Sequence, residues 1–460
     1  MDRRRFLQVT GAAGLASLLP VEEAHSSGAQ EQPNVVVFMA DDLGYTDISS
    51  FGAKHIETPS IDRLGQQGMV WNNFYAGAPN CSPSRGAMLT GRFPTRIGMY
   101  SYVPPSTPMH LRESELTTAE ILRGQGYETA HVGKWHLCSD LVSGEFPVPS
   151  DHGFDHWFAT ENNARPSHHN PDNFVRNGKP VGKLEGYSCQ LVADEAIGWL
   201  TEKQDRGKPF FLNVWFHEPH RKVAAPPDLL KRHKGQRNPE YLACIENMDA
   251  AIGRVLEALD EMGVAENTFV LFTSDNGSYR KGSNDDFRGR KSFVWEGGTH
   301  VPAVMRWPGH IEPGSTCSTP AGVVDLLPTL CDLARVEPPT DRTVDGASMA
   351  PAFRGGEISR STPLYWFFYR TDPACAIRVG DWSLAGYLDE KVPPGHSFRP
   401  SHMEYLRRAE LARFELYNLR EDPGQESNVA AQHPERLARM KEQMIAVHRD
   451  CVREGPNWFE

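Results

Sequence analysis

The chain has 460 residues, of which 48 are Lys or Arg and 59 are Asp or Glu, so its formal net charge is −11. With 39% hydrophobic and 23% charged residues it has the composition of a folded globular protein, which excludes collagen-like and disordered chains. The sequence has no long block of Lys and Arg, and we therefore expect no nucleic-acid partner, because binding phosphates needs clustered basic side chains.

Residues 1–30 resemble a twin-arginine signal peptide. Arg3, Arg4 and Arg5 precede a short apolar stretch and then a run of small residues. The apolar stretch is far shorter than the roughly 20 residues of a membrane-spanning helix, although an uncleaved anchor remains an alternative. We expect the twin-arginine machinery of a bacterium to export the protein to the periplasm or cell surface, with no membrane span in the mature chain.

Residues 31–356 alternate between strand and helix patterns. Apolar, β-branched runs predict buried strands at 34–40, 210–216 and 268–277. Apolar residues at helical spacing predict helices over 58–68, 116–126, 190–203 and 241–263. This alternation is typical of an α/β fold, and it predicts a large mixed, mostly parallel sheet with helices on both faces.

Residues 357–460 follow another pattern. Short strand-like runs occur at 362–370, 374–387 and 413–419, and a charged helical pattern covers about 429–451. We therefore expect a smaller C-terminal α+β subdomain, made of an antiparallel sheet and a terminal helix.

Polar residues follow three of the predicted strands. Asp41 and Asp42 follow the first, His217 to His220 the second, and Asp275 and Asn276 the third. Since ligands bind outside the carboxyl ends of strands in open α/β sheets, the sequence predicts one site there.

The most specific motif is Cys81, Pro83, Ser84 and Arg85, followed by Leu-Thr-Gly-Arg at 89–92. A single thiol, with no other Cys or His nearby in the sequence, does not favour a metal cluster. A simple Cys nucleophile whose pKa is lowered by Arg85 is an alternative. The motif resembles the signature of the type I sulfatases of the alkaline phosphatase superfamily, and the resemblance extends over nearly the whole mature chain. It implies an alkaline phosphatase-like fold and the conversion of Cys81 to formylglycine by a formylglycine-generating or sulfatase-maturating enzyme.

The resemblance also implies roles for individual residues. It implies one Ca²⁺ per chain, which suits oxygen ligands, held by position 81 and by Asp41, Asp42, Asp275 and Asn276. The implied catalytic residues are Cys81, Arg85, Lys134, His136, His217 and Lys291. Arg288 and Arg290 are further basic residues close in sequence to Lys291.

The implied reaction is hydrolysis of a sulfate monoester. One hydroxyl of the formylglycine gem-diol attacks sulfur, His217 or Lys291 protonates the leaving alcohol, and a sulfated enzyme forms. The second hydroxyl, deprotonated with help from His136, then expels sulfate. Lys134, Lys291, Arg85 and Ca²⁺ supply the positive field that this chemistry needs.

The substrate is less well defined by the sequence. An irregular segment and the motif at 217–220 supply the residues that we expect to contact a sugar: Asn162, Asn163, Arg165, His168, His169 and Glu218. These motifs resemble bacterial sulfatases that act on sulfated galactose or N-acetylgalactosamine units of glycans. The alternatives are a phosphonate or phosphate monoester hydrolase of the same superfamily and a non-catalytic protein that binds sulfated glycans.

Overall fold

The computed structural model describes residues 32–105, 107–280, 282–395 and 398–460, and Gln32–Glu460 form one compact unit. The predicted signal peptide, residues 1–30, lies outside the described residues.

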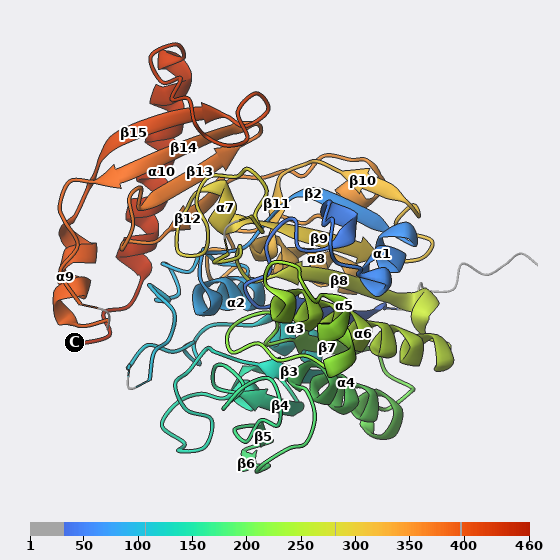
Figure 1. Ribbon diagram of the computed structural model, residues 1–460. Coiled ribbons are helices and arrows are strands. Elements are labelled where there is room, and N and C mark those ends of the chain that lie inside the picture. Colours follow the sequence, from blue (N-terminus) through green and yellow to red (C-terminus); the bar gives the residue numbers. More distant parts are fainter. Residues whose placement is uncertain (1–31, 106, 281, 396–397) are drawn as a thin grey trace, which may run out of the picture. The chain divides into compact units, whose positions relative to one another are not determined.

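An eleven-stranded mixed sheet forms the larger part of this unit (Figure 1). Its order is β10-β2-β9-β8-β1-β7-β3-β4-β5-β6, and β11 also pairs with β2. The strands are β1 (Asn34–Ala40), β2 (Met69–Tyr75), β3 (Glu128–Lys134), β4 (His156–Thr160), β5 (Val175–Arg176), β6 (Lys179–Pro180), β7 (Phe210–Trp215), β8 (Thr268–Ser274), β9 (His300–Arg306), β10 (Ser315–Cys317) and β11 (Ala321–Gly322). The neighbours β8, β1, β7, β3 and β4 all run parallel.

Helices cover both faces of the sheet, because its central strands bury both faces. Val35, Val37 and Met39 of β1 belong to one hydrophobic cluster, whereas Val36 and Phe38 belong to another. The helices are α1 (Pro59–Gln66), α2 (Cys81–Thr90), α3 (Thr118–Gly124), α4 (Ser188–Gly198), α5 (Pro227–Arg232), α6 (Pro239–Glu261), α7 (Glu296–Thr299) and α8 (Leu326–Ala334). The predicted α/β architecture is confirmed.

A second, antiparallel sheet follows in the order β12-β13-β14-β15. It comprises β12 (Leu364–Phe367), β13 (Cys375–Val379), β14 (Trp382–Leu388) and β15 (Leu411–Asn418), accompanied by α9 (Pro400–Arg408) and α10 (Pro434–Glu454). This confirms the predicted C-terminal sheet and helix. Tyr365 and Met444 lie in the same hydrophobic cluster as Met39, so the core is continuous between the sheets.

The large sheet contains strands that the sequence did not predict. The predicted runs correspond to β1, β7 and β8, whereas β3 and β4, which run parallel, and β2 and β9, which pair antiparallel, were not predicted. The strand β3 ends at Lys134, and His136 beyond it has a φ of 55°.

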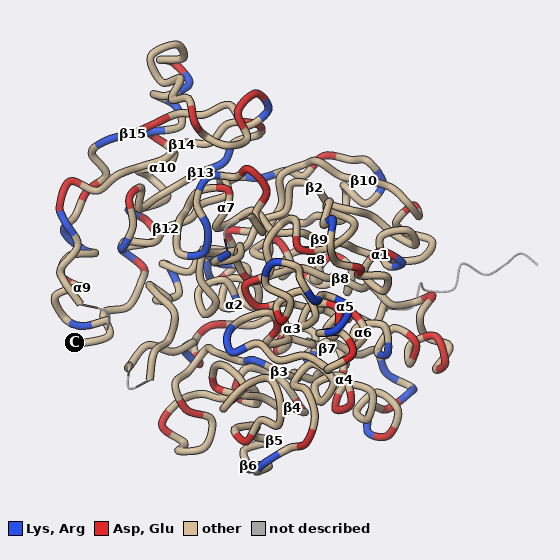
Figure 2. Tube along the Cα trace, in the orientation of Figure 1, with Lys and Arg blue, Asp and Glu red and all other residues tan. Residues whose placement is uncertain are grey.

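Among the described residues, no helix combines the length and the hydropathy that crossing a bilayer requires. Acidic and basic residues are interspersed along most of the trace (Figure 2).

Candidate active site

Polar side chains of the site lie at the carboxyl ends of four neighbouring strands, which are β8, β1, β7 and β3. Asp41 and Asp42 follow β1, Asp275 and Asn276 follow β8, and all four are at most 1% exposed. The backbone N–H of Asp42 donates to Oδ1 of Asp275 over 3.1 Å. Parallel pairing of β1 with β8 therefore joins residues more than 230 positions apart in the sequence.

These side chains form a cluster of oxygen atoms that fits a hard cation. Ligand atoms of Asp41, Cys81 and Asp275 lie within 4.8 Å of one another, as do those of Asp41, Asp42 and His220. The Asn276 amide N–H donates to Oδ1 of Asp42 over 2.8 Å. This contact leaves Oδ1 of Asn276 and Oδ2 of Asp42 buried without a hydrogen-bond partner in the described residues. Buried acceptors of this kind normally have a partner, and a cation would supply it.

Arg85 and Lys134 hold the carboxylates in place. Arg85 donates to Oδ2 of Asp275 through Nε over 3.1 Å and Nη2 over 2.7 Å, and to the Lys134 carbonyl over 2.9 Å. Lys134 Nζ donates to Oδ2 of Asp41 over 2.5 Å. Burial opposes ionisation of Asp41, but the positive charges of Lys134, His220, Arg85 and Lys291 outweigh it and hold the pKa of this carboxyl well below its usual value. Burial and the charge of Asp41 raise the pKa of Asp275 to about 7.

Cys81 is the first residue of α2. Pro83 in the first turn and Gly91 at the C-terminal cap, with a φ of 65°, agree with helix limits at Cys81 and Thr90. The Cys81 Sγ lies 3.5 Å from Oδ1 of Asp41 and 3.5 Å from Nζ of Lys291. Burial raises the pKa of the thiol to about 12, so the unmodified side chain is protonated at neutral pH. Arg85 is engaged with Asp275, which argues against the alternative of a thiolate activated by Arg85.

Lys291 is the basic residue of its segment that reaches the site. Its Nζ donates to Oδ1 of Asp42 over 2.5 Å. Although burial favours the neutral amine, the charge of Asp42 and its neighbours raises the pKa of Lys291. Arg288 points elsewhere, because it stacks on Trp295 and donates to the Gln425 carbonyl over 3.0 Å.

Two buried histidines present one unpartnered nitrogen each. Nε2 of His136 contacts the Val103 carbonyl at 3.0 Å, and Nε2 of His217 contacts Oγ1 of Thr160 at 2.8 Å. In both rings Nδ1 is buried without a hydrogen-bond partner in the described residues. Burial, together with nearby positive groups such as Lys134, lowers both pKa values.

The residues expected to contact a sugar fall into two groups. Asn162, Asn163 and Arg165 line a cavity of about 530 Å³. Asn163 lies beside the oxygen cluster, since its Oδ1 accepts a hydrogen bond from Lys134 Nζ over 3.1 Å.

His168, His169 and Glu218 are not among the lining residues of this cavity. His168 and Glu218 are at most 1% exposed, and Glu218 accepts from the backbone N–H of His217 over 3.1 Å. Glu218 thus fixes the segment that carries His217. The exposed His169 packs against the ring of Tyr187.

Sequence reasoning missed two residues of the site. We assigned no role to His220 from the sequence, but its Nε2 lies 3.5 Å from Oδ2 of Asp42. Its position in the same short motif as His217 was an available signal. Thr160 ends β4 and contacts His217, and no motif marks it.

Comparison with known proteins agrees with this geometry. The family model described as Sulfatase matches residues 33–336, and that of the C-terminal part of N-sulphoglucosamine sulphohydrolase matches residues 287–391. The chain is 34% identical to N-acetylgalactosamine-6-sulfatase of Canis lupus familiaris over 414 residues, covering 82% of this chain and 74% of that protein. It is 31% identical to the steryl-sulfatase of Mus musculus over 556 residues, covering 99% of this chain and 88% of that protein.

A similar solved structure is that of Ps i-CgsB in complex with k-i-k-neocarrahexaose. Its TM-score is 0.79 at 26% sequence identity, and the match covers 91% of this chain and 93% of that chain.

Proposed function

The chain belongs to the sulfatase family and is a sulfuric ester hydrolase, and we propose that it acts on sulfated carbohydrates carrying galactose or N-acetylgalactosamine units. The observation that carries the proposal is the cavity whose lining includes Asn162, Asn163 and Arg165, because Asn163 also accepts a hydrogen bond from Lys134. Amide and guanidinium groups suit sugar hydroxyls, whereas an apolar sterol would leave them without partners. The similarity to an N-acetylgalactosamine-6-sulfatase supports the same substrate class.

We propose Ca²⁺ as the ion at the oxygen cluster. Asp41, Asp42, Asp275 and Asn276 would hold it together with position 81, and a set of oxygen donors favours Ca²⁺ over Zn²⁺. When bound, the ion would polarise sulfate oxygens and the nucleophile.

Removing the metal should therefore lower stability as well as activity. After treatment with a chelator we expect the melting temperature to fall by several degrees, because a ligand at about 100 times its Kd stabilises the folded state by about 2.7 kcal/mol. Differential scanning fluorimetry after adding back Ca²⁺, Mg²⁺ or Zn²⁺ measures this effect. Full recovery with Zn²⁺ but not with Ca²⁺ would contradict the assignment.

We propose that Cys81 is converted to formylglycine by a formylglycine-generating or sulfatase-maturating enzyme. Formylglycine would supply a hydrated aldehyde, one hydroxyl of which attacks sulfur while the other allows sulfate to be released. Lys291 Nζ lies 3.5 Å from Cys81 Sγ, and Lys134 Nζ contacts the neighbouring Asp41, so both side chains would attract the anionic sulfate.

The hydrogen bonds of the histidines define their proton states. A carbonyl only accepts, so Nε2 of His136 carries the proton toward Val103 and Nδ1 is free to accept one. This arrangement supports the proposed role of His136 as the base that prepares sulfate release. The hydroxyl of Thr160 donates to the Asn162 carbonyl over 2.5 Å, so Nε2 of His217 donates to Thr160.

Two groups remain as donors to the leaving alcohol. Lys291 carries a proton at neutral pH. His217 gains one at Nδ1 once bound sulfate raises its pKa, since a nearby negative charge favours imidazolium.

The proposed function is tested by measuring sulfate release from sulfated galactose and N-acetylgalactosamine by the purified protein. Mass spectrometry of the peptide around position 81 reports formylglycine in the same sample. Faster turnover of phosphate or phosphonate esters would favour the alternative hydrolase, and binding of sulfated glycans without any turnover would favour the non-catalytic alternative.

The cavity at Asn162 and Arg165 should determine the affinity for the sugar rather than the rate of the chemical step. Replacing Asn162 and Arg165 with Ala should raise the KM for a sulfated sugar about tenfold, because one or two hydrogen bonds between the protein and the sugar would be lost. We expect kcat and the hydrolysis of a small aryl sulfate to change little. His169→Ala is the matched control, because that side chain lies outside the cavity. Equal KM values for both variants would remove the cavity as the sugar site.

The remaining proposals concern where the protein acts. The predicted twin-arginine signal at 1–30 supports export by that machinery to the periplasm or surface of a bacterium. That route carries folded proteins, so Cys81 could be modified before export. Formylglycine in precursor retained inside the cell is the expected result, and an unmodified thiol there would contradict this order of events.

A further inference from the structure

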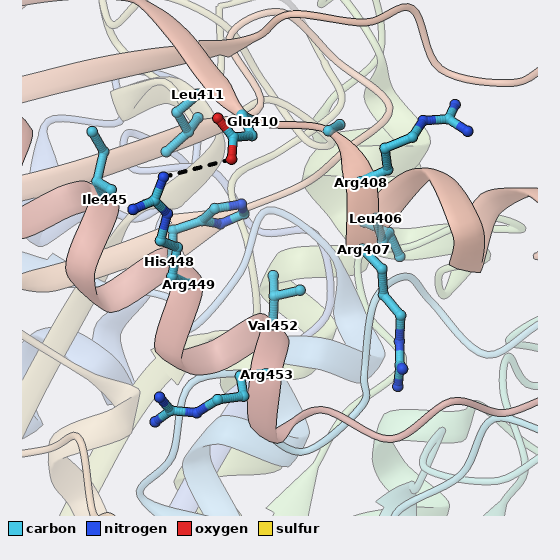
Figure 3. A pocket seen from close by; sticks show the side chains of 11 residues that line it. Leu406, Arg407, Arg408, Glu410, Leu411, Ile445, His448, Arg449, Val452 and Arg453 are labelled. Atoms are coloured by element: carbon cyan, nitrogen blue, oxygen red, sulfur yellow. Dashed lines mark ion pairs between the residues drawn. The ribbon is translucent and has the colours of Figure 1, made fainter.

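A groove of about 400 Å³ lies between the end of α9, the start of β15 and the last turns of α10. These three elements supply none of the residues of the candidate active site. Arginine predominates among the charged residues of the groove, which are Arg407, Arg408, Glu410, Arg449 and Arg453 (Figure 3). In a chain with a net charge of −11, four arginines against one glutamate are a local reversal of charge.

The floor of the groove is apolar. Leu406 is buried, and Leu411, Ile445 and Val452 are half-buried along it. Burial lowers the pKa of His448 to about 4, so this ring adds no charge at neutral pH. A lining that combines guanidinium groups with aliphatic side chains suits a ligand that has both C–H faces and anionic substituents.

The guanidinium groups of Arg407 and Arg449 remain available to a ligand. Arg408 donates to both carboxylate oxygens of Glu390 and Arg453 pairs with Asp450, so these two groups are engaged outside the groove. Arg449 pairs with Glu410 at 3.5 Å, but each side chain is 69% exposed. Exposed pairs of this kind contribute little free energy. Among the described residues, no carboxylate lies within ion-pair distance of Arg407.

We propose that this groove, called here the α9–α10 groove, binds a sulfated saccharide at a site separate from the active site. A pyranose ring can lie on the aliphatic floor while its sulfate groups accept paired hydrogen bonds from guanidinium groups. The identity of the ligand rests on the proposed function, since the substrate polymer carries these groups. Holding one part of a polymer would raise the local concentration of its other sulfated units.

The test compares two double variants that remove the same charge. Arg407→Gln with Arg449→Gln alters the groove, and Arg237→Gln with Arg420→Gln alters exposed arginines elsewhere. Both carry Cys81→Ala for the binding measurement, so that the probe is not hydrolysed. The probe is a sulfated galactosaminoglycan titrated by calorimetry, together with its chemically desulfated form, a polyglutamate of matched charge and inorganic sulfate.

We expect the groove variant to bind the sulfated polymer roughly tenfold more weakly than the control variant, because it would lose a charged hydrogen-bonded pair between a guanidinium group and a sulfate group. The desulfated polymer should bind weakly to both proteins. Equal affinities of the two variants for the sulfated polymer would overturn the proposal. The same would follow if polyglutamate or inorganic sulfate bound the groove as tightly as the polymer.

A second measurement separates this inference from the proposed function. Without the Cys81→Ala change, the groove variant should hydrolyse a sulfated monosaccharide at the rate of the unaltered protein. If neither protein releases sulfate, the proposed function fails, while the binding comparison still decides whether the groove holds the polymer.

Discussion

Replacing Cys81 with Ala should lower sulfate release by at least about four orders of magnitude, the usual effect of removing a catalytic nucleophile. The change removes one sulfur atom that lies 3.5 Å from both Asp41 Oδ1 and Lys291 Nζ. It also removes the thiol group that the proposed oxidation of Cβ to the formylglycine aldehyde requires. The backbone of α2 is unaffected, because Ala is a good helix former. Sulfate release by ion chromatography measures the effect.

The matched control for this variant is Cys331→Ala. Cys331 is also buried, in α8, and lies outside the site. Both variants should unfold within a few degrees of the unaltered protein, since each loses only a small buried group. Turnover by Cys81→Ala within tenfold of the control would exclude formylglycine at this position.

Replacing Lys134 with Met should lower kcat/KM on the order of 10³-fold, because the ammonium group would no longer stabilise charge on the sulfate. Lys134 is fully buried and contacts both Asp41 and Asn163. Removing one partner of a buried ion pair costs about 3–5 kcal/mol when the other charge stays unpaired. Kinetics and chemical denaturation should therefore both change.

Two comparisons separate the catalytic effect from the structural one. Lys208→Met alters an exposed lysine and should leave both measurements unchanged. Ca²⁺ should restore much of the stability of the Lys134→Met protein by neutralising Asp41, but it should not restore turnover. Recovery of kcat/KM together with stability would mean that Lys134 only supports the fold.

The sequence was sufficient to predict the architecture. The runs at 34–40, 210–216 and 268–277 are mainly apolar, and apolar and polar residues do not alternate along them. Such runs form strands that are buried on both faces, and they can be recognised from the local sequence alone. Helical spacing is likewise a local property. The strand β2, Met-Val-Trp-Asn-Asn-Phe-Tyr, was missed because it carries two polar residues in its middle, and its strand conformation depends on pairing with β9, β10 and β11, which lie far away in the sequence.

The sequence also determined the types of group at the site. The motif at 81–92 is one continuous segment, and the carboxylates come directly after β1 and β8. Each of these local patterns could therefore be recognised without a structure. The sequence did not determine which atoms meet. Arg85 was expected only as a positive charge, but the structure joins it to Asp275, 190 residues away.

Tertiary structure alone decided the hydrogen-bond partners of the histidines and which residues of the irregular segment line the cavity. The partners of His136 and His217 are Val103 and Thr160, which come from a loop and from the end of β4. Hydrogen bonding and burial depend on groups brought together from distant segments, whereas strand and helix patterns depend on neighbours along the chain. For the same reason one continuous loop sequence was divided by folding, with Asn162 lining the cavity and His168 buried beside Glu218.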